Sequence, residues 1–467
     1  MPVRKYTYYD YTISLCPTCL KRIEAKIVFE EGKVYMLKTC ADHGFHKVLI
    51  ATDVEYYKSI RNYNKPSETP LKFSNKVHYG CPYDCGLCTD HEQHSCLTLI
   101  EVTDRCNLAC PTCYAMSSPH YGRHRTLEEI EKMLDIIVES EGEPDVVQIS
   151  GGEPTIHPQF FEILDIAKKK PIKHLMVNTN GVRIANDPGF AEKLATYMPD
   201  FELYLQWDSF RPEVLETLRG KDLTDVRYKA IEKLNELNLS TTLVMTLQKG
   251  LNDDEIGKSI EYALQQRCVR GVTFQPVQIA GRFEHDPEKN RLTLTDVREG
   301  ILNQTDIFKP NDILPVPCNP DALAMGYALK LNGQVFPLTR YVDPDMLLDS
   351  SKNTIVYEQD DKLHEQIFKV FSTAVSVDAV TEDMNQLLCC LPQIKAPGLT
   401  YDNLFRIIIM RFIDAYDFDV RAIKKSCVHI VSKSGQIIPF ETMNLFYRDE
   451  KEAYLNQLKE GFEPIRK

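Results

Sequence analysis

From Leu97 onward, short apolar runs alternate with longer segments of helical periodicity. This alternation predicts parallel strands joined by crossover helices, because buried parallel strands read as nearly continuous apolar runs. We expect strands at residues 97–102, 146–149, 174–178, 203–207, 241–247 and 271–275. A helix should follow Thr126, which can form a capping box with Glu129. Its apolar face would comprise Leu127, Ile130, Met133, Leu134, Ile137 and Val138.

The segment before this core begins with a different pattern, two short strands flanked by metal-ligand residues. Strands at 25–29 and 34–38 are joined by a Glu-Glu-Gly turn, with Cys16 and Cys19 before them and Cys40 and His43 after them. The spacing predicts a rubredoxin- or zinc-ribbon-like module with one tetrahedral metal. His46 is an alternative to His43, and four unligated residues are the other interpretation. Three thiolates and an imidazole suit zinc and iron equally.

A second cysteine group follows a polar linker at 64–75 and directly precedes the first core strand. Cys81, Cys85 and Cys88 have three and then two residues between them, which favours an auxiliary 4Fe-4S cluster. Cys96 is the preferred fourth ligand, and His91 or His94 are weaker candidates. A second zinc site is the alternative.

The same spacing recurs at Cys106, Cys110 and Cys113, immediately after the first core strand. One loop carrying three thiolates can ligate three irons of a 4Fe-4S cluster and leave the fourth iron open. A zinc knuckle is the alternative, but zinc sites usually close with a second ligand pair. We therefore favour a catalytic iron–sulfur cluster at this loop.

Polar residues gather where the expected strands end. The second strand runs into Ser150-Gly151-Gly152-Glu153-Pro154, whose glycines permit close backbone approach to a ligand. Further candidates for cofactor or substrate contacts at strand ends are Asn178, Asn180, Gln206, Asp208 and Gln275. Each of these, taken singly, could instead be a loop cap or turn residue. Their shared placement at the carboxyl ends of strands favours a site there.

The last third of the chain carries dispersed cysteines and one strongly apolar segment. Cys318, Cys389, Cys390 and Cys427 are either ligands of a further cluster or four buried thiols. The segment 405–412 could line an apolar tunnel or form a buried strand. A charged helical connector at 286–312 precedes this region.

The composition of the chain excludes several classes of protein. The chain has 467 residues, 43% of them hydrophobic, with 15 cysteines and a net charge of −12. The acidic balance and the lack of a Lys/Arg cluster argue against nucleic-acid binding. No signal-peptide or membrane-spanning pattern is evident. Cysteines grouped as metal ligands indicate a reducing compartment, so we expect a cytoplasmic protein.

The combination of Cys106-x3-Cys110-x2-Cys113 with Ser150-Gly-Gly-Glu-Pro154 resembles the radical S-adenosylmethionine (SAM) enzymes. The resemblance implies that SAM is chelated by the open iron and that Gly151-Gly152-Glu153 contacts its amino group. It also implies an α/β fold, a partial (β/α)6 TIM-like barrel, here at 97–284. Thr112 departs from the family, which usually has an aromatic residue there, so Tyr114 or a backbone contact could hold the adenine.

The full layout is similar to the branch that contains the archaeal tetraether lipid synthase and a pterin C-methylating enzyme. That branch implies one or two auxiliary 4Fe-4S clusters and a mononuclear iron or zinc. We divide the chain into a metal module (1–63), an auxiliary iron–sulfur segment (76–96), the barrel (97–284) and a C-terminal α+β auxiliary-cluster and substrate region (285–467).

The implied activity is reductive cleavage of SAM to a 5'-deoxyadenosyl radical that abstracts hydrogen from an unactivated carbon. Carbon–carbon bond formation on a lipid-like substrate is the favoured outcome. Radical C-methylation of a pterin-like ring is one alternative, and a non-catalytic iron–sulfur electron carrier is another. The implied partners are SAM, the lipid-like or pterin-like substrate and a flavodoxin- or ferredoxin-type electron donor. Peripheral membrane contact would accompany a lipid substrate.

Overall fold

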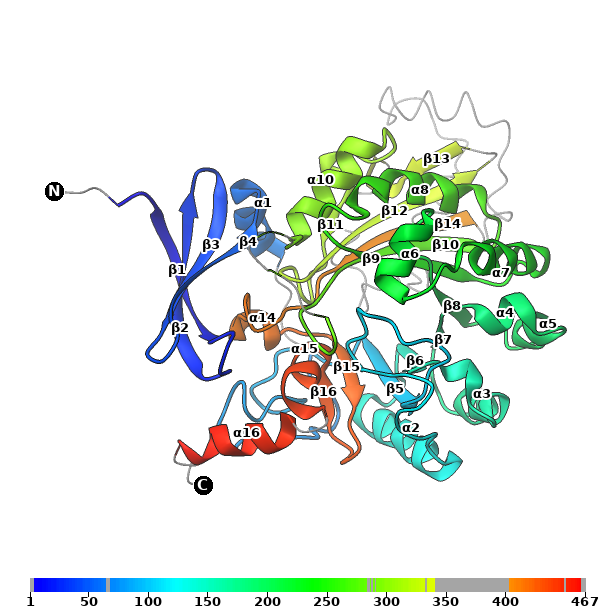
Figure 1. Cartoon of the computed structure of the whole chain (residues 1–467), viewed down its shortest axis with the longest axis horizontal. Coiled ribbons are helices and arrows are strands. Elements are labelled where there is room, and N and C mark those ends of the chain that lie inside the picture. Colours follow the sequence, from blue (N-terminus) through cyan, green and yellow to red (C-terminus); the bar gives the residue numbers. More distant parts are fainter. Residues whose placement is uncertain are drawn as a thin grey trace, which may run out of the picture.

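The computed structural model describes residues 4–63, 68–283, 286, 289, 291–331, 334–340, 403–448 and 451–462. The N-terminal module is an antiparallel sheet whose four strands follow each other in sequence order, at the left of Figure 1. Its elements are β1 (Thr7–Leu15), β2 (Arg22–Glu30), β3 (Lys33–Cys40), β4 (Gly44–Ala51), α1 (Val54–Ser59) and the 3-10 helix Ile60–Tyr63. The predicted hairpin is the β2–β3 pair.

The predicted barrel strands all form, and each pairs in parallel with the next. They are β5 (Leu97–Thr103), β6 (Val146–Gly151), β7 (His174–Thr179), β8 (Phe201–Gln206), β9 (Thr241–Leu247) and β10 (Val269–Pro276). The crossover helices are α2 (Leu127–Glu141), α3 (Phe160–Lys168), α4 (Val182–Asn186), α5 (Phe190–Ala195), α6 (Pro212–Arg219), α7 (Thr224–Leu237) and α8 (Ile256–Gln265), with short 3-10 turns at Pro154–Ile156 and Asp253–Glu255. The capping box of Thr126 and Glu129 is present at the start of α2.

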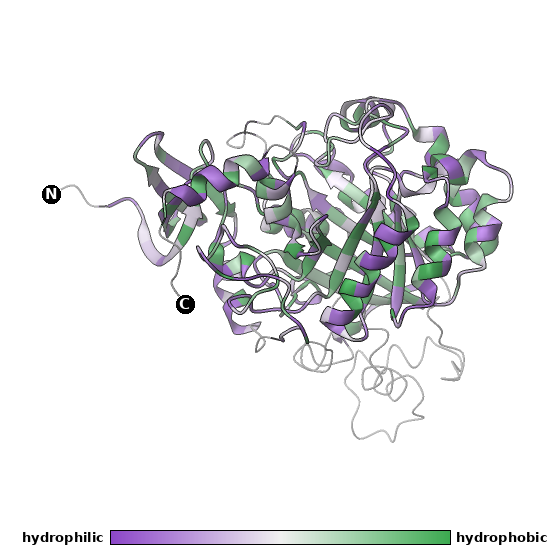
Figure 2. Ribbon diagram, turned by 90° about the horizontal axis from the view of Figure 1, so that it is seen from below, coloured by the Kyte–Doolittle hydropathy of each residue, from purple (hydrophilic) through white to green (hydrophobic). Residues whose placement is uncertain are grey.

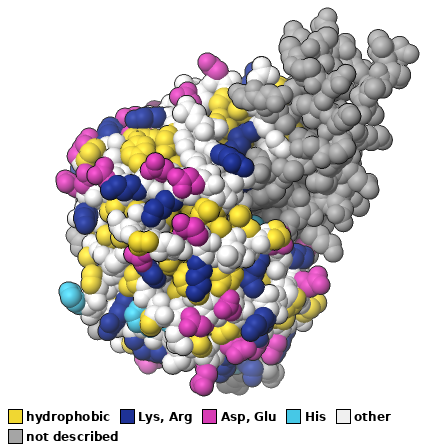
Figure 3. Space-filling model, turned by 90° about the vertical axis from the view of Figure 1, so that its right-hand side faces the viewer, with side chains coloured by type: hydrophobic (Ala, Val, Ile, Leu, Met, Phe, Trp, Pro, Cys, Tyr) yellow, Lys and Arg dark blue, Asp and Glu magenta, His cyan; other side chains and the backbone are white. Residues whose placement is uncertain are grey.

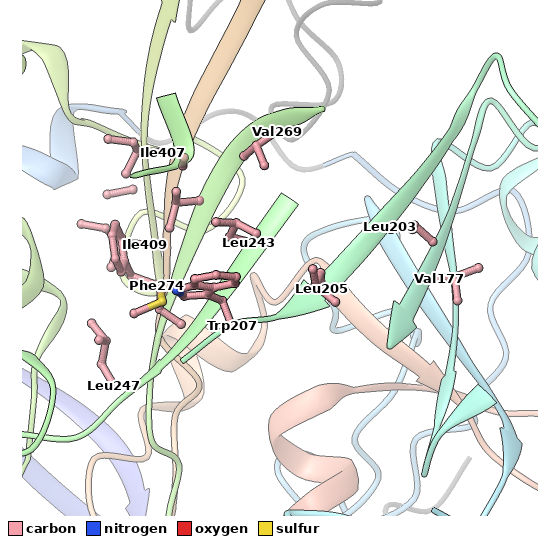
Figure 4. Packing of buried hydrophobic residues seen from close by; sticks show 14 of the residues in the cluster. Val177, Leu203, Leu205, Trp207, Leu243, Leu247, Val269, Phe274, Ile407 and Ile409 are labelled. Carbon is pink, nitrogen blue, oxygen red and sulfur yellow. The ribbon is translucent and has the colours of Figure 1, made fainter. Parts of the chain in front are cut away.

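Alternate side chains of these strands enter two different apolar layers. Val177, Leu203 and Leu243 belong to the core between the strands and the surrounding helices (Figure 4). Their neighbours Met176 and Tyr204 belong to a second cluster inside the barrel. Figure 2 shows the hydrophobic residues concentrated along the strands, and hydrophilic residues more frequent on the helices. This period of two fixes which residues can face a ligand inside the barrel.

Two strands from the C-terminal region extend the barrel sheet at both edges. β14 (Leu404–Met410) pairs in parallel with β10, and β15 (Val428–Val431) pairs in parallel with β5. The apolar segment 405–412 is therefore a buried strand up to Met410, as one of its two interpretations predicted. The C-terminal region is thus continuous with the barrel sheet.

The remaining elements surround these two edges. They are α10 (Leu294–Gln304), the 3-10 turns Pro310–Asp312 and Leu338–Arg340, β11 (Leu314–Pro315), β12 (Leu323–Leu331), β13 (Gln334–Pro337), α14 (Val420–Ile423), β16 (Ile437–Pro439), α15 (Phe440–Thr442), the π-helix Met443–Tyr447 and α16 (Lys451–Glu460). β12 lies antiparallel to β14, and β16 lies antiparallel to β15.

Buried polar contacts join the N-terminal module to the C-terminal region. The ammonium group of Lys38 donates to the carbonyl oxygens of Leu15 (2.7 Å) and Ala415 (2.9 Å). Burial lowers the pKa of Lys38 to about 7. Arg61 and Asp321 form a two-bond ion pair with both N···O distances at 2.6 Å. The module is therefore fixed to the body of the protein by specific bonds.

Among the helices of the described residues, none has the length and apolar character needed to cross a membrane. The face shown in Figure 3 carries acidic and basic side chains interspersed with hydrophobic ones.

Candidate active site and metal centres

The loop after β5 carries Cys106, Cys110 and Cys113. Cys106 and Cys110 are 8% and 9% exposed, and Cys113 is partly buried. The backbone N–H of Leu108 points at the Cys106 Sγ (3.4 Å), as N–H groups do around metal-bound thiolates. Burial raises the pKa of the Cys106 thiol to about 12, and the nearby Glu153 carboxylate adds to the shift. The Cys106 thiol therefore needs a positive partner in order to lose its proton, and a bound metal cluster would be one.

The Gly151-Gly152-Glu153 segment packs tightly against the backbone that leads into Cys106. A Cβ atom on Gly151 would lie 2.3 Å from the Thr103 carbonyl oxygen, and one on Gly152 would lie 2.1 Å from that of Arg105. The N–H groups of Gly152 and Glu153 donate to these same two oxygens. The glycines thus permit close approach to the chain's own backbone, and the predicted approach of this backbone to a ligand stays a prediction.

Glu153 is 1% exposed and no basic side chain bonds its carboxylate in the part of the chain described. The carboxylate accepts hydrogen bonds from the Thr155 hydroxyl (2.6 Å), the Thr179 hydroxyl (2.8 Å) and the Asn180 N–H (2.7 Å). Burial raises its pKa despite these donors. A cationic group in the adjoining cavity would therefore stabilise the charged form of Glu153.

A large cavity extends from the cysteine loop into the barrel. Its empty volume is about 1270 Å³, open solvent at the mouth included. The predicted site residues that line it are Cys106, Cys110, Cys113, Gly151, Gly152, Glu153, Asn178, Asn180, Gln206 and Gln275. Tyr114, which we considered as an adenine contact, also lines it.

Pro154 and Asp208 do not line this cavity. Pro154 starts the short 3-10 turn after Glu153 and is buried. Asp208 is fully buried and its carboxylate bonds the Arg219 guanidinium at 2.5 and 2.7 Å. The structure therefore places these two residues behind the cavity wall, which differs from the prediction that they bind the cofactor.

Arg219, which the sequence did not single out, lines the cavity instead. It lies at the end of α6 and also donates to the side-chain oxygens of Gln206 (2.8 Å) and Thr246 (2.9 Å). Burial raises the pKa of the Cys110 thiol, and the neighbouring Arg219 charge opposes that rise. No local pattern identifies this arginine, because its partners come from two other strands.

In the N-terminal module the ligand atoms of Cys16, Cys19, Cys40 and His43 all lie within 4.8 Å of one another. His43 Nδ1 is 3.6 Å from both Cys16 Sγ and Cys40 Sγ, and it lowers the pKa of Cys40 to about 6. Three thiols and one imidazole at this spacing fit a tetrahedral metal. His46, the alternative ligand, is not part of the group, and its Nε2 is buried without a hydrogen-bond partner.

Cys96 groups with Cys318 and Cys427, and their sulfur atoms lie within 4.8 Å of one another. This differs from the prediction that Cys96 completes the Cys81, Cys85 and Cys88 group. The reason is the β5–β15 pairing, because Leu97 and Val428 are register partners and each directly follows one of these cysteines. His94 Nε2 lies 3.6 Å from the Cys96 sulfur. A three-thiol set with a nearby imidazole fits a metal cluster.

Two residues of the predicted C-terminal cysteine set, Cys389 and Cys390, lie outside the described residues. His91, a weaker ligand candidate, instead bonds the Ser426 carbonyl oxygen through Nε2 (2.8 Å). These contacts leave His94 as the histidine nearest a cysteine group in this region.

Cys81, Cys85 and Cys88 lie in a buried turn beneath the C-terminal helices. Burial raises the pKa of all three thiols, and Cys85 interacts electrostatically with both of the others. The Asp84 carboxylate fixes the turn by accepting from the N–H groups of His78 (2.6 Å) and Gly80 (3.1 Å). These three cysteines could supply three ligands of a cluster, and which residues ligate that cluster stays a prediction.

Comparison with known proteins agrees with these features. Residues 100–263 match the family model of the radical SAM superfamily, and residues 8–52 match that of an "HMPTM N-terminal zinc ribbon domain". The barrel, the cysteine loop and the Gly-Gly-Glu segment together define a radical SAM enzyme. The resemblance found in the sequence is thus confirmed, as are the barrel and the zinc-ribbon-like module.

One similar protein covers nearly the whole chain. The 7,8-dihydro-6-hydroxymethylpterin dimethyltransferase of Methanocaldococcus jannaschii is 30% identical over 480 residues, which span 94% of each chain. The chain belongs to the family of this dimethyltransferase within the radical SAM superfamily.

Other similar proteins cover less of the chain. The GTP 3',8-cyclase of Syntrophomonas wolfei is 31% identical over 40% of this chain and 57% of that protein. The crystal structure of Streptococcus suis SuiB has 17% identity over 46% of each chain and a TM-score of 0.38.

Proposed function

We propose that this enzyme cleaves SAM reductively, that the resulting 5'-deoxyadenosyl radical abstracts hydrogen from a pterin-like substrate, and that a separate one-carbon donor supplies the methyl group which that carbon receives. The observation that carries the proposal is the match to the M. jannaschii dimethyltransferase over 94% of both chains. The polar lining of the cavity beyond the cysteine loop supports it, because Asn178, Gln206 and Gln275 offer amide groups to a heterocycle. A lipid-like substrate, favoured from the sequence alone, has weaker support than the pterin alternative.

The residues around the cavity suit this chemistry. A 4Fe-4S cluster held by Cys106, Cys110 and Cys113 would supply the electron that breaks a carbon–sulfur bond of SAM and releases a 5'-deoxyadenosyl radical. Glu153 offers an unneutralised buried carboxylate to the ammonium group of SAM. Arg219 keeps positive charge beside Cys110. The barrel walls exclude water from the space where hydrogen is abstracted.

The metal groups outside the barrel would have different tasks. Cys16, Cys19, Cys40 and His43 would hold a structural zinc or iron, because all four positions of a tetrahedral site are filled by protein. Cys96, Cys318 and Cys427 lie at the opposite end of β5 from the catalytic loop. An auxiliary cluster held there would lie close enough to the barrel to exchange electrons with it.

The experiment uses anaerobically reconstituted protein, SAM, a strong reductant and 7,8-dihydro-6-hydroxymethylpterin deuterated on its saturated ring carbon and hydroxymethyl carbon. We expect the pterin to stimulate 5'-deoxyadenosine formation and deuterium to appear in that nucleoside. The matched control is Cys106→Ala, which should abolish nucleoside formation while the other metal sites keep their iron or zinc. Nucleoside without deuterium would refute the pterin proposal, and nucleoside from Cys106→Ala would refute the cluster assignment.

A further inference from the structure

Gln148 is a buried amide on β6 whose nitrogen makes no hydrogen bond in the ligand-free fold. Its side chain is 3% exposed and its Nε2 has no hydrogen-bond partner. Burying an amide without a partner is unfavourable. The fold therefore carries an unfavourable group on the inward face of β6, where its same-face neighbour Val146 is apolar.

The position of Gln148 gives it access to a ligand. It lines the large cavity and also the smaller cavity beneath it, so it lies at the floor of the ligand space. Its register partners on the neighbouring strands are Leu99 and Met176, both apolar. A ligand that reaches this layer meets the Gln148 amide beside the apolar side chains of Leu99 and Met176, and polar side chains such as Thr242 and Arg406 lie in the lining of the smaller cavity beneath.

The amides of Asn178, Gln206 and Gln275 each make at least one hydrogen bond to another side chain of the cavity wall. Gln206 Nε2 donates to the Asn178 side-chain oxygen (2.9 Å), and the Gln206 oxygen accepts from Arg219 (2.8 Å). Gln275 Nε2 donates to the Tyr204 hydroxyl (2.9 Å). These bonds hold the upper wall in place, whereas the donor of Gln148 is available to a ligand.

We propose that Gln148 pairs with the lactam edge of the pterin ring and determines specificity for it; this inference rests on the proposed function. A glutamine amide presents one donor and one acceptor beside each other. The lactam edge of a pterin presents the complementary pair, an N–H next to a carbonyl oxygen. Two parallel hydrogen bonds would satisfy the buried Nε2, and the apolar layer would contact the faces of the ring.

The test compares the wild type with Gln148→Leu in the fully metal-loaded enzyme. The dissociation constants of 7,8-dihydro-6-hydroxymethylpterin and of its N3-methyl analogue, which lacks the lactam N–H, are measured under anaerobic conditions. The wild type should prefer the parent pterin by roughly tenfold or more. Gln148→Leu should weaken binding of the parent by roughly ten- to hundredfold and bind the two compounds equally.

The matched control is Ile149→Leu, a volume-conserving change on the opposite face of β6, in the core between the strands and the helices. It should leave both dissociation constants within about twofold. The melting temperature of ligand-free Gln148→Leu should equal or exceed that of the wild type, because an unpaired amide is removed. A structural role for Gln148 predicts a lower melting temperature instead.

The outcomes separate the two proposals. If the wild type binds the pterin and Gln148→Leu keeps its affinity and its preference for the parent compound, the assignment of Gln148 is wrong and the proposed function stands. If the wild type does not bind the pterin, the proposed function and the inference both fail. Gln148→Met provides a second apolar variant should Gln148→Leu not fold.

Discussion

Removal of the Arg219 guanidinium should destabilise the protein strongly, because it leaves a buried carboxylate behind. Asp208 is 0% exposed and bonds Arg219 through both oxygens. Burial disfavours the charged form of Asp208, but the Arg219 and Arg227 charges outweigh burial and hold its pKa below the usual value. The charged state of Asp208 therefore depends on these arginines.

The size of the destabilisation depends on the partners that Asp208 keeps in Arg219→Leu. Loss of one partner of a buried ion pair costs about 3–5 kcal/mol. Asp208 would still have Arg227 Nη2 at 3.4 Å and the Thr246 N–H at 3.2 Å. We therefore expect a loss near the lower end, about 3 kcal/mol in the free energy of unfolding. The double variant Arg219→Leu/Asp208→Leu should recover much of it, because no unpaired charge stays buried.

The assay is anaerobic urea unfolding followed by circular dichroism, with the midpoint and slope fitted for each variant. The matched control is Arg123→Leu, since Arg123 also forms a two-bond pair with a carboxylate, that of Glu129. That pair is exposed, with side chains 56% and 41% accessible, so its loss should cost about 0–1 kcal/mol. The reasoning is refuted if Arg219→Leu costs no more than Arg123→Leu.

Two further predictions concern the histidines. His43→Ala should remove the metal from the N-terminal module, whereas His46→Ala should leave the metal content unchanged; elemental analysis of both variants decides between them. Burial lowers the pKa of His91 to about 4, below that of an unfolded histidine near 6.5. Stability from this group is fully present above pH 6.5 and is lost toward pH 4, by about 3 kcal/mol. The urea midpoint of the wild type should therefore fall as the pH is lowered over this range, and the midpoint of His91→Asn should fall less steeply. An equal dependence of the midpoint on pH in both proteins would contradict this prediction.

The sequence predicted the barrel well because its signals are local. Each strand from β5 to β10 is an apolar run, and the capping box before α2 is contained within four residues. The three-cysteine loop could be singled out for the same reason, since Cys106, Cys110 and Cys113 lie within one turn-rich segment, and its catalytic role stays a proposal.

Features that depend on distant contacts were not predictable. Cys96 is adjacent in sequence to the Cys81 group, yet strand pairing brings it to Cys427. Asp208 lies at a strand end, as a ligand-binding residue would, but Arg219 at the far end of the following helix α6 bonds its carboxylate. Gln148 did leave a local signal, because it is the polar residue within the otherwise apolar run from Val146 to Ile149.

The separation of the cysteine groups along the chain has a consequence for biosynthesis. Cys16 and His43 are 27 residues apart, so the N-terminal site can be completed while most of the chain is still being translated. Cys318 and Cys427 are 109 residues apart, and Cys96 lies far upstream of both. The loop closure needed to gather these three is possible only when the C-terminal strands have been made. Metal at this site would therefore mark a finished chain, and truncated products would be unable to acquire it.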